Sequence, residues 1–272
     1  MSIKELRPIV VGGGNLGGAV LRGLKRAGFA PLAVELAGAN FDGLVADGIE
    51  AVTTLSEALK KSEGPVFVAL KPWLMKNYCQ QNSALLAGRL CVSCAAMVDL
   101  DVLSDAAPEA SWGRIMTNIG ASAGCAFTGI VRGTWTDEQS AAVQELCLSF
   151  GDAEFVAEKD LDAIVGLSGS GIAYVLELLE GFIQGGLAVG MNAKLSQSVG
   201  IATVLGAAEL VRAKGVHPAV LKDSVCTPGG TTIAGLRALQ QSGFRSAFIE
   251  ALVATAEKSK AGSEAFRSAA SK

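Results

Sequence analysis

A glycine-rich run near the start of the sequence restricts the fold more than any other feature. It reads Val10-Val11-Gly12-Gly13-Gly14-Asn15-Leu16-Gly17-Gly18, so a short apolar segment, a G-x-G-x-x-G spacing and the start of a helical pattern follow one another. Gly12 permits a tight turn after a strand, Gly14 lets a ligand approach the backbone, and Gly17 lets the helix pack on the strand. The run predicts a β-α unit that binds a dinucleotide. A glycine-rich turn without a ligand is the alternative.

The pattern along the rest of the chain indicates two domains. Short β-rich runs alternate with helical stretches as far as Val156, and this alternation is typical of a parallel sheet. After Leu161 only long helical stretches follow. We therefore predict an α/β fold with an N-terminal Rossmann-type dinucleotide-binding domain, residues 1–158, and an all-α C-terminal dimerisation and substrate domain, residues 159–272.

The expected elements have the following bounds. Strands are predicted at Pro8–Gly12, Ala33–Leu36, Val66–Leu70, Leu90–Cys94, Ser111–Met116, Cys125–Arg132 and Glu154–Val156. Helices of the first domain are predicted at Asn15–Ala27, Met75–Leu86 and Asp137–Ser149. Helices of the second domain are predicted at Ser170–Gly190, Ala193–Ala213, Pro218–Val225, Thr231–Ser242 and Phe244–Ala270.

Composition and charge exclude several classes of function. The single histidine, His217, cannot build a multi-histidine metal centre, so we expect no metal and a structural role for this residue. The net charge of −3 and scattered basic residues argue against nucleic acid as a partner. The longest stretch without a charged residue, between Arg114 and Arg132, is interrupted by polar residues and glycines, so no membrane span is expected. Without a signal-peptide pattern, the expected location is the cytoplasm.

The six cysteines do not resemble a disulfide framework, because a chain of 272 residues can bury a sufficient core without cross-links. Cys91 and Cys94 form a C-x-x-C, but it lies in an apolar run that reads as a buried strand, with no second pair nearby. A structural role is favoured over metal or redox chemistry.

Further candidate cofactor residues follow the predicted strands, because ligands of open α/β sheets bind beyond the carboxyl ends of strands. Glu35 could accept hydrogen bonds from ribose hydroxyls and repel a 2′-phosphate, which would favour NADH; a solvated carboxylate is the alternative. Lys71, in Ala69-Leu70-Lys71-Pro72, could neutralise ligand charge or be a surface lysine. The small side chains of Ser93–Ala96 would admit a ring.

The second half contains another glycine-rich helix start, Thr227-Pro228-Gly229-Gly230-Thr231-Thr232. The free N–H groups of Thr231 and Thr232 could hold a small carboxylate, whereas simple helix capping is the alternative. The helices around it carry glycine and alanine on apolar faces, and the stretch Val199–Leu210 is apolar nearly all round. A subunit interface is a natural place for such a surface.

With these motifs in place, the chain resembles the pyrroline-5-carboxylate reductases. The resemblance runs through nearly the whole sequence in the family's order. It rests on Gly12–Ala19, Ala69–Pro72, Ser93–Ala96, Met116–Asn118, Gly166–Gly171 and Pro228–Leu236 continuing to Gly243–Arg245. It implies hydride transfer from NADPH or NADH to the C=N carbon of Δ1-pyrroline-5-carboxylate, giving L-proline. It also implies a homodimer through interlocked helical domains, which in the family is often assembled further into a decamer.

The resemblance carries roles over to particular positions. Thr232 is implied as the catalytic position, with its hydroxyl near the ring nitrogen of the substrate, and substrate binding is implied for Thr227, Thr231, Thr232 and Glu158. Cofactor binding is implied for Gly12, Gly14, Asn15, Leu16, Gly17, Glu35, Ser56, Ala69, Leu70, Lys71, Pro72, Cys94, Ala95, Ala96 and Ser224.

The chain departs from the family pattern at a few positions. Met97 replaces a usual glycine and could narrow the pocket near the nicotinamide; Gly120 and Ile172 replace prolines. Ser56 and Ser224 also differ from the residues that are common there. Two other functions stay open. The chain could reduce another small cyclic imine or a hydroxyacid, or it could be an inactive nucleotide-binding sensor.

Overall fold

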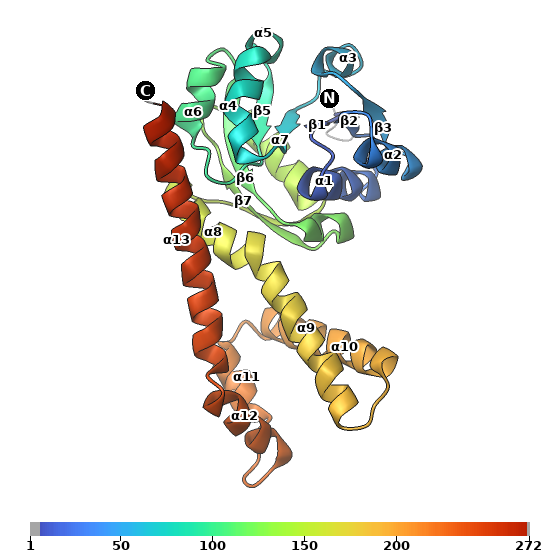
Figure 1. Cartoon of the computed structure of the whole chain (residues 1–272), viewed down its shortest axis with the longest axis vertical. Coiled ribbons are helices and arrows are strands. Elements are labelled where there is room, and N and C mark those ends of the chain that lie inside the picture. The colour runs from blue at the N-terminus through green and yellow to red at the C-terminus, as the bar shows by residue number, and fades with distance from the viewer. Residues whose placement is uncertain (1–5, 271–272) are drawn as a thin grey trace. The chain divides into compact units, whose positions relative to one another are not determined.

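The computed structural model describes residues 6–270, and their contacts group them into two compact units (Figure 1). Unit 1 holds the chain up to Ser170 and again from Val253 onward, and unit 2 is Gly171–Leu252. Contacts thus assign the residues just after 158, and the C-terminal part of the last helix, to the unit that contains the sheet. The boundary predicted at 158 lies shortly after the last strand, which ends at Phe155.

Unit 1 is built on one eight-stranded sheet with the order β3-β2-β1-β4-β5-β6-β7-β8. The pairs are parallel except β6 with β7, which is antiparallel. The strands are β1 Ile9–Val11, β2 Leu32–Val34, β3 Glu50–Val52, β4 Val66–Val68, β5 Leu90–Ser93, β6 Ser111–Met116, β7 Ala126–Val131 and β8 Gly151–Phe155. The Rossmann-type arrangement is therefore confirmed, and β3 is a strand that the sequence prediction missed.

Both faces of the sheet are covered because its central strands are apolar on both sides. Alternate residues such as Val10 and Phe67 face one buried cluster, whereas Ile9 and Val66 face the other. The helices of unit 1 are α1 Asn15–Arg26, α2 Ala39–Ala46, α3 Leu55–Leu59, α4 Pro72–Gln81, α5 Ser83–Leu86, α6 Leu100–Ala106, α7 Asp137–Leu148 and α8 Leu161–Ile164. The first cluster includes residues of α1 and α7, and the second includes residues of α3, α4 and α6.

Unit 2 is entirely helical, as expected, and its helix bounds agree with the predicted ones to within two residues. They are α9 Gly171–Ala188, α10 Ala193–Lys214, α11 Pro218–Ser224, α12 Thr231–Gln241 and the first part of α13 Phe244–Ala270. Glycines allow α9 and α10 to approach closely, because a Cβ at Gly186 would stand 2.1 Å from Ser196 Oγ. A π-helical turn, Val165–Ser170, leads into α9.

Candidate cofactor and substrate sites

Three glycines of the first loop each meet a different steric demand. Gly12 ends β1 with φ at +95°, and a Cβ there would lie 2.7 Å from the Ala69 carbonyl oxygen. A Cβ on Gly17 would lie 1.8 Å from the Gly12 carbonyl oxygen, so α1 packs directly on the loop backbone. Gly14, by contrast, has nothing within 4 Å of its Cβ position. The space that Gly14 leaves open is where a ligand can approach the backbone.

The N-terminus of α1 is open to an anion. Its N-cap is Gly14, and no side chain caps the helix, so the first-turn N–H groups are available. Asn15 is exposed and Leu16 is half-buried against the core. Free N–H groups at a positive helix end, next to a glycine without steric neighbours, fit the pyrophosphate of a dinucleotide.

Glu35 lies just after β2 and contacts the glycine-rich loop. Its carboxylate accepts a hydrogen bond from the Gly13 N–H and another, at 2.9 Å, from the N–H of Leu36. Beside it lies a cavity of about 350 Å³, and its wall combines the ends of β1 and β2 with one side of α4. This cavity lies where the adenosine half of a dinucleotide binds in such sheets.

Sequence reasoning missed most of the wall of this cavity. From α4 it is lined by Leu74, Asn77, Tyr78 and Gln81, which follow the spacing i, i+3, i+4, i+7 of one helix face. This spacing of apolar and polar residues on one face of α4 was the sequence signal for the cavity wall, but a helix this short shows such a pattern only weakly. Tyr78 is half-buried, and its hydroxyl has no hydrogen-bond partner among the described residues.

The loops after β4 and β5 lie side by side at the same sheet edge. The Ala69 N–H donates to Val11 O at 2.8 Å, and the Cys94 N–H donates to Val68 O at 3.0 Å. Lys71 is exposed at the N-cap of α4, with Pro72 as the first helical residue, and Leu70 lines the cavity. Ser56 is exposed on α3 and is not among the residues lining the cavity. Of the predicted cofactor residues, Gly12, Glu35 and Leu70 line the cavity.

The C-x-x-C does not offer reactive thiols. Cys91 and Cys94 are buried and free, and burial raises the pKa of each thiol to about 12. Both thiols are therefore protonated at neutral pH, which agrees with the structural role predicted for them. Ala95 is buried and Ala96 half-buried, so the segment presents mainly backbone to a ligand.

Glu158 belongs to an ion-pair network that the sequence did not predict. Its Oε1 accepts from Arg114 Nη1 at 2.7 Å and from the Leu100 N–H at 3.0 Å. Arg114 is 3% exposed and also pairs with Asp99 at 3.1 Å, and Asp99 in turn pairs with Arg267 of α13. Burial raises the pKa of Asp99, and the two arginines only partly offset this. The hydrogen bonds from Arg114 and Leu100 hold the Glu158 carboxylate in place through its Oε1.

In unit 2, the predicted substrate loop forms an uncapped helix start. Gly229 adopts a positive φ of 69°, Gly230 is the N-cap of α12, and no side chain caps this helix. The Gly230 N–H donates to Thr227 O at 3.0 Å, while Thr231 and Thr232 are exposed in the first turn. This loop therefore presents free N–H groups and the Thr232 hydroxyl, a combination suited to a small carboxylate beside a polar ring.

Two other predicted positions make local contacts. Ser224 ends α11, and its hydroxyl donates to Leu221 O at 2.7 Å. His217 caps α11, with Nδ1 accepting the Ala219 N–H at 3.2 Å, which agrees with the structural role expected of it.

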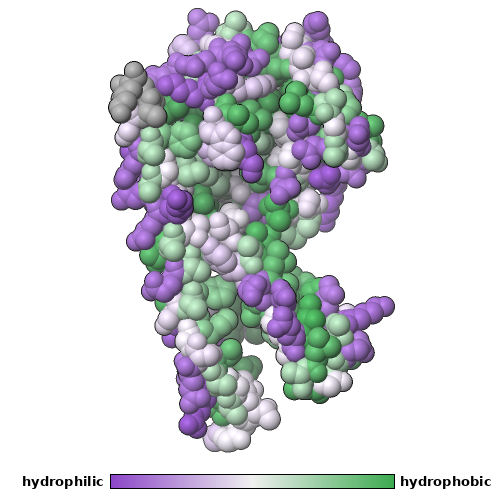
Figure 2. Space-filling model, viewed as in Figure 1, coloured by the Kyte–Doolittle hydropathy of each residue, from purple (hydrophilic) through white to green (hydrophobic). Residues whose placement is uncertain are grey.

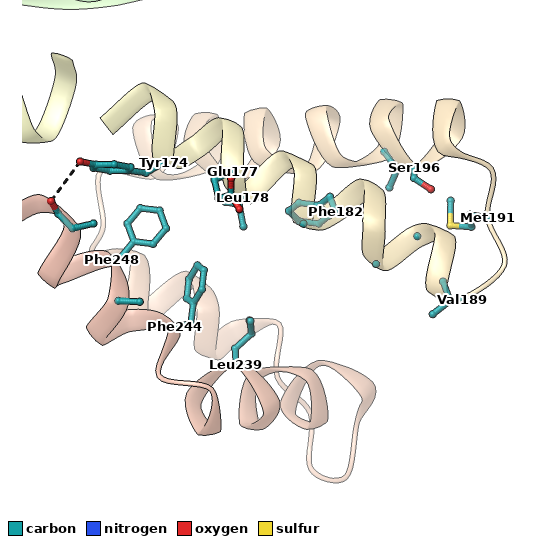
Figure 3. A pocket seen from close by; sticks show the side chains of 16 residues that line it. Tyr174, Glu177, Leu178, Phe182, Val189, Met191, Ser196, Leu239, Phe244 and Phe248 are labelled. Atoms are coloured by element: carbon teal, nitrogen blue, oxygen red, sulfur yellow. Dashed lines mark hydrogen bonds between the residues drawn. The ribbon is translucent and has the colours of Figure 1, made fainter. Parts of the chain in front are cut away.

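Unit 2 leaves its apolar side chains uncovered. Between residues 171 and 252 no apolar side chain larger than glycine is buried, and Val189 and Leu205 are 77% and 59% exposed. Figure 2 shows apolar surface along α9. A cavity of about 770 Å³ opens between α9, α10, α12 and α13, and Phe182, Phe244 and Phe248 line it (Figure 3). Aromatic contacts such as Phe244 with Phe248, 5.3 Å between ring centroids, form one wall.

Comparisons with known proteins identify the family. A family model described as pyrroline-5-carboxylate reductase dimerisation matches residues 158–262. The pyrroline-5-carboxylate reductase of Arabidopsis thaliana is 35% identical over 257 residues, covering 92% of this chain and 93% of the plant protein. That of Escherichia coli (strain K12) is 35% identical over 258 residues, covering 92% and 96%.

Solved structures share the fold of the whole chain. A crystal structure of Plasmodium falciparum pyrroline carboxylate reductase with NADP bound superposes with a TM-score of 0.87 at 22% identity, covering 96% of this chain and 99% of the other. A reductase from Coxiella burnetii gives 0.82 at 24% identity, covering 95% and 98%. Because it is 35% identical to the Arabidopsis thaliana and Escherichia coli reductases over 92% of its length, the chain belongs to the pyrroline-5-carboxylate reductase family.

Proposed function

We infer that this protein is a pyrroline-5-carboxylate reductase, which uses NAD(P)H to reduce Δ1-pyrroline-5-carboxylate to L-proline in the last step of proline biosynthesis. The observation that carries this conclusion is the 35% identity to reductases of plants and bacteria over 92% of the chain. The open loop at Gly14 and the uncapped N-terminus of α1 support use of a dinucleotide.

We propose that unit 1 holds the dinucleotide. The pyrophosphate lies on the N–H groups at the start of α1, the adenosine ribose lies beside Glu35, and the nicotinamide half lies near Ala69–Pro72 and Cys94–Ala96. When bound, NAD(P)H supplies the hydride. The task of the chain's own residues is to hold the reacting groups in the correct geometry.

The substrate half of the site is proposed on the α12 loop. The N–H groups of Thr231 and Thr232 bind the substrate carboxylate at the positive end of α12, with Thr227 bracing the turn. We propose that the Thr232 hydroxyl binds near the ring nitrogen, that Glu158 is a substrate-binding residue and that Ser224 is a cofactor-binding residue. A protonated cyclic imine is already electrophilic, so this chemistry needs neither a metal nor a histidine pair.

The proposed role of Thr232 is tested by Thr232→Ala, with Thr232→Ser as the matched variant that keeps the hydroxyl. Loss of one preorganised donor is expected to lower kcat on the order of 10²–10³. The serine variant should retain most of the activity. The measurement is oxidation of NADH and NADPH, followed by absorbance, with pyrroline-5-carboxylate. Normal turnover by Thr232→Ala would contradict the role.

The same assay separates the alternatives. A larger kcat/KM with piperideine carboxylate would indicate a reductase of another small cyclic imine. If neither nucleotide were consumed with any substrate, the protein would instead be a nucleotide-binding sensor.

We propose that the protein is a homodimer through unit 2, with a decamer as a possible higher assembly. The exposed apolar helices and the 770 Å³ cavity support this, because a partner subunit would cover them.

By length and composition alone, Glu158–Ala188 could also cross a membrane, but it contains Glu177 and Glu180. We assign its apolar face to the partner subunit and propose a cytoplasmic enzyme without nucleic-acid or membrane partners.

A further inference from the structure

Met97 has an unusual backbone conformation in the loop between β5 and α6. Its φ is 65°, and among residues 6–270 it is the one residue other than glycine with a positive φ. A side chain in this left-handed region is disfavoured, so the surrounding structure must hold it there. The loop begins with Cys94–Ala96, the segment at the carboxyl edge of the sheet.

The side chain of Met97 lies directly against α13. A Cβ on Gly262 would stand 2.0 Å from Met97 Sδ and 2.9 Å from its Cγ. Only a glycine at position 262 therefore allows the methionine to occupy this place. The contact accounts for the glycine in the middle of a long helix.

Neighbouring residues of the same helix face contact the sheet-containing part of unit 1 as well. Ser259 and Ser263 are both buried, and their hydroxyls donate to Asp162 Oδ1 at 2.6 and 3.2 Å. Arg267 pairs with Asp99, two residues after Met97, at 2.7 Å. The positions 259, 262, 263 and 267 form one helical stripe, so the helix has a defined register against the loop.

We propose that Met97 and Gly262 are positioning residues, through which the C-terminal part of α13 holds the Cys94–Met97 loop in place for the nicotinamide half of the dinucleotide. This inference rests on the proposed function, which assigns that half to the Cys94–Ala96 segment. In this proposal Met97 acts through the loop backbone, because its side chain lies against Gly262 of α13. Its effect is therefore expected on cofactor geometry, since small displacements of reacting groups have large effects on rate.

The test is Gly262→Ala in the full-length enzyme, because the added methyl group must displace the methionine side chain. Gly43→Ala, in the middle of α2, is the matched control, since nothing lies within 4 Å of its Cβ position. Alanine raises helix propensity at both positions. An effect that came only from helix propensity would therefore be the same in both variants.

The readouts are kcat, the KM for NADH and the inhibition constant of ADP-ribose, which lacks the nicotinamide. Gly262→Ala is expected to raise the KM for NADH about tenfold and to lower kcat. The inhibition constant of ADP-ribose should not change, because the glycine-rich loop and Glu35 are untouched. Adding Met97→Ala should bring both parameters back to the smaller defect of Met97→Ala alone, a non-additive result expected of residues in contact.

Three outcomes would overturn the inference: parameters equal to those of Gly43→Ala, no recovery in the double variant, or an equal rise in the ADP-ribose constant. If Gly262→Ala does not fold, Met97→Ala alone decides, because it removes the contact without a clash. It should raise the KM for NADH and leave the inhibition constant of ADP-ribose unchanged. A wild-type enzyme that bound neither ADP-ribose nor NADH would contradict the proposed function instead.

Discussion

At the scale of single residues, the second and third glycines of the G-x-G-x-x-G motif, Gly14 and Gly17, have separable roles. Gly14 has an empty Cβ position and an ordinary negative φ, so Gly14→Ala should fold with unchanged stability. Its methyl group would occupy the path of the pyrophosphate and raise the KM for nucleotide by about tenfold or more. Gly17→Ala would place a carbon 1.8 Å from a backbone oxygen and should destabilise the fold.

Thermal unfolding and nucleotide KM, measured on both variants, check this pair. If Gly14→Ala lowered the unfolding temperature as much as Gly17→Ala, both glycines would be required for packing of the fold, and the proposed role of Gly14 in nucleotide binding would be contradicted. The sequence motif could predict that glycines are needed here, but only the structure separates their reasons.

Glu35 is expected to set nucleotide preference in two ways. Its charge repels a 2′-phosphate, and its carboxylate anchors Gly13 in the loop. Glu35→Gln removes the charge and keeps an acceptor, so the ratio of kcat/KM for NADPH to that for NADH should rise. Glu35→Ser should raise the ratio too, with a larger loss for NADH because the anchor is also removed. An unchanged ratio in both variants would exclude Glu35 from cofactor choice.

At the scale of elements, the sequence predicted what has a strong local signal. The long helices of the second half, such as α9 and α10, and the central strands, such as β1 and β4, lie where the patterns placed them. The strand β3 was missed because it lies at the sheet edge and begins with the exposed Glu50, so it lacks the continuous apolar run of β1 or β4. The following α3 was missed as well, since five residues are too few to show a period.

Contacts between distant elements had no sequence signal at all. Arg114 and Glu158 are 44 positions apart, and Ser259 bonds to Asp162 across 97 positions. No local pattern records such pairs, because they form only when distant segments of the chain meet in the folded unit. The same applies to Met97 and Gly262, where the sequence indicated an unusual methionine but not what it touches.

The docking of α13 includes a carboxyl group whose charge is unfavourable in the folded state. The raised pKa of Asp99 means that folding favours its protonated form, chiefly because of burial. Its stabilising contribution is therefore complete below the ordinary Asp pKa of 3.8 and is lost as the pH rises through the raised value. Asp99→Asn stays neutral at every pH and should lack this loss.

The expected result is that the free energy of unfolding of the wild type, minus that of Asp99→Asn, decreases as the pH rises above 3.8. Chemical denaturation of both proteins at a series of pH values measures this difference, and titration of all other groups cancels in it. A difference that increased with pH would mean that the pairs with Arg114 and Arg267 outweigh burial.

At the scale of the whole molecule, the two units differ in how they are stabilised. The sheet of unit 1 has two buried apolar clusters, whereas unit 2 buries no apolar side chain within one chain. Helices that expose this much apolar surface are not expected to be stable alone in water. We therefore expect unit 2 to depend on association for its stability, and the proposed substrate loop on α12 to depend on it in turn.

Val199 and Val45 provide a matched test of this association. Both are valines on helices, 46% and 50% exposed in the single chain, but Val199 of α10 lines the cavity of unit 2 and Val45 lies on α2 of unit 1. If a partner covers Val199, Val199→Glu buries a charge twice in a two-fold dimer and should weaken association by at least ~10²-fold. Val45→Glu should leave the dimer intact. Sedimentation velocity over a range of protein concentrations measures both, and two variants that associate like the wild type would place the interface elsewhere.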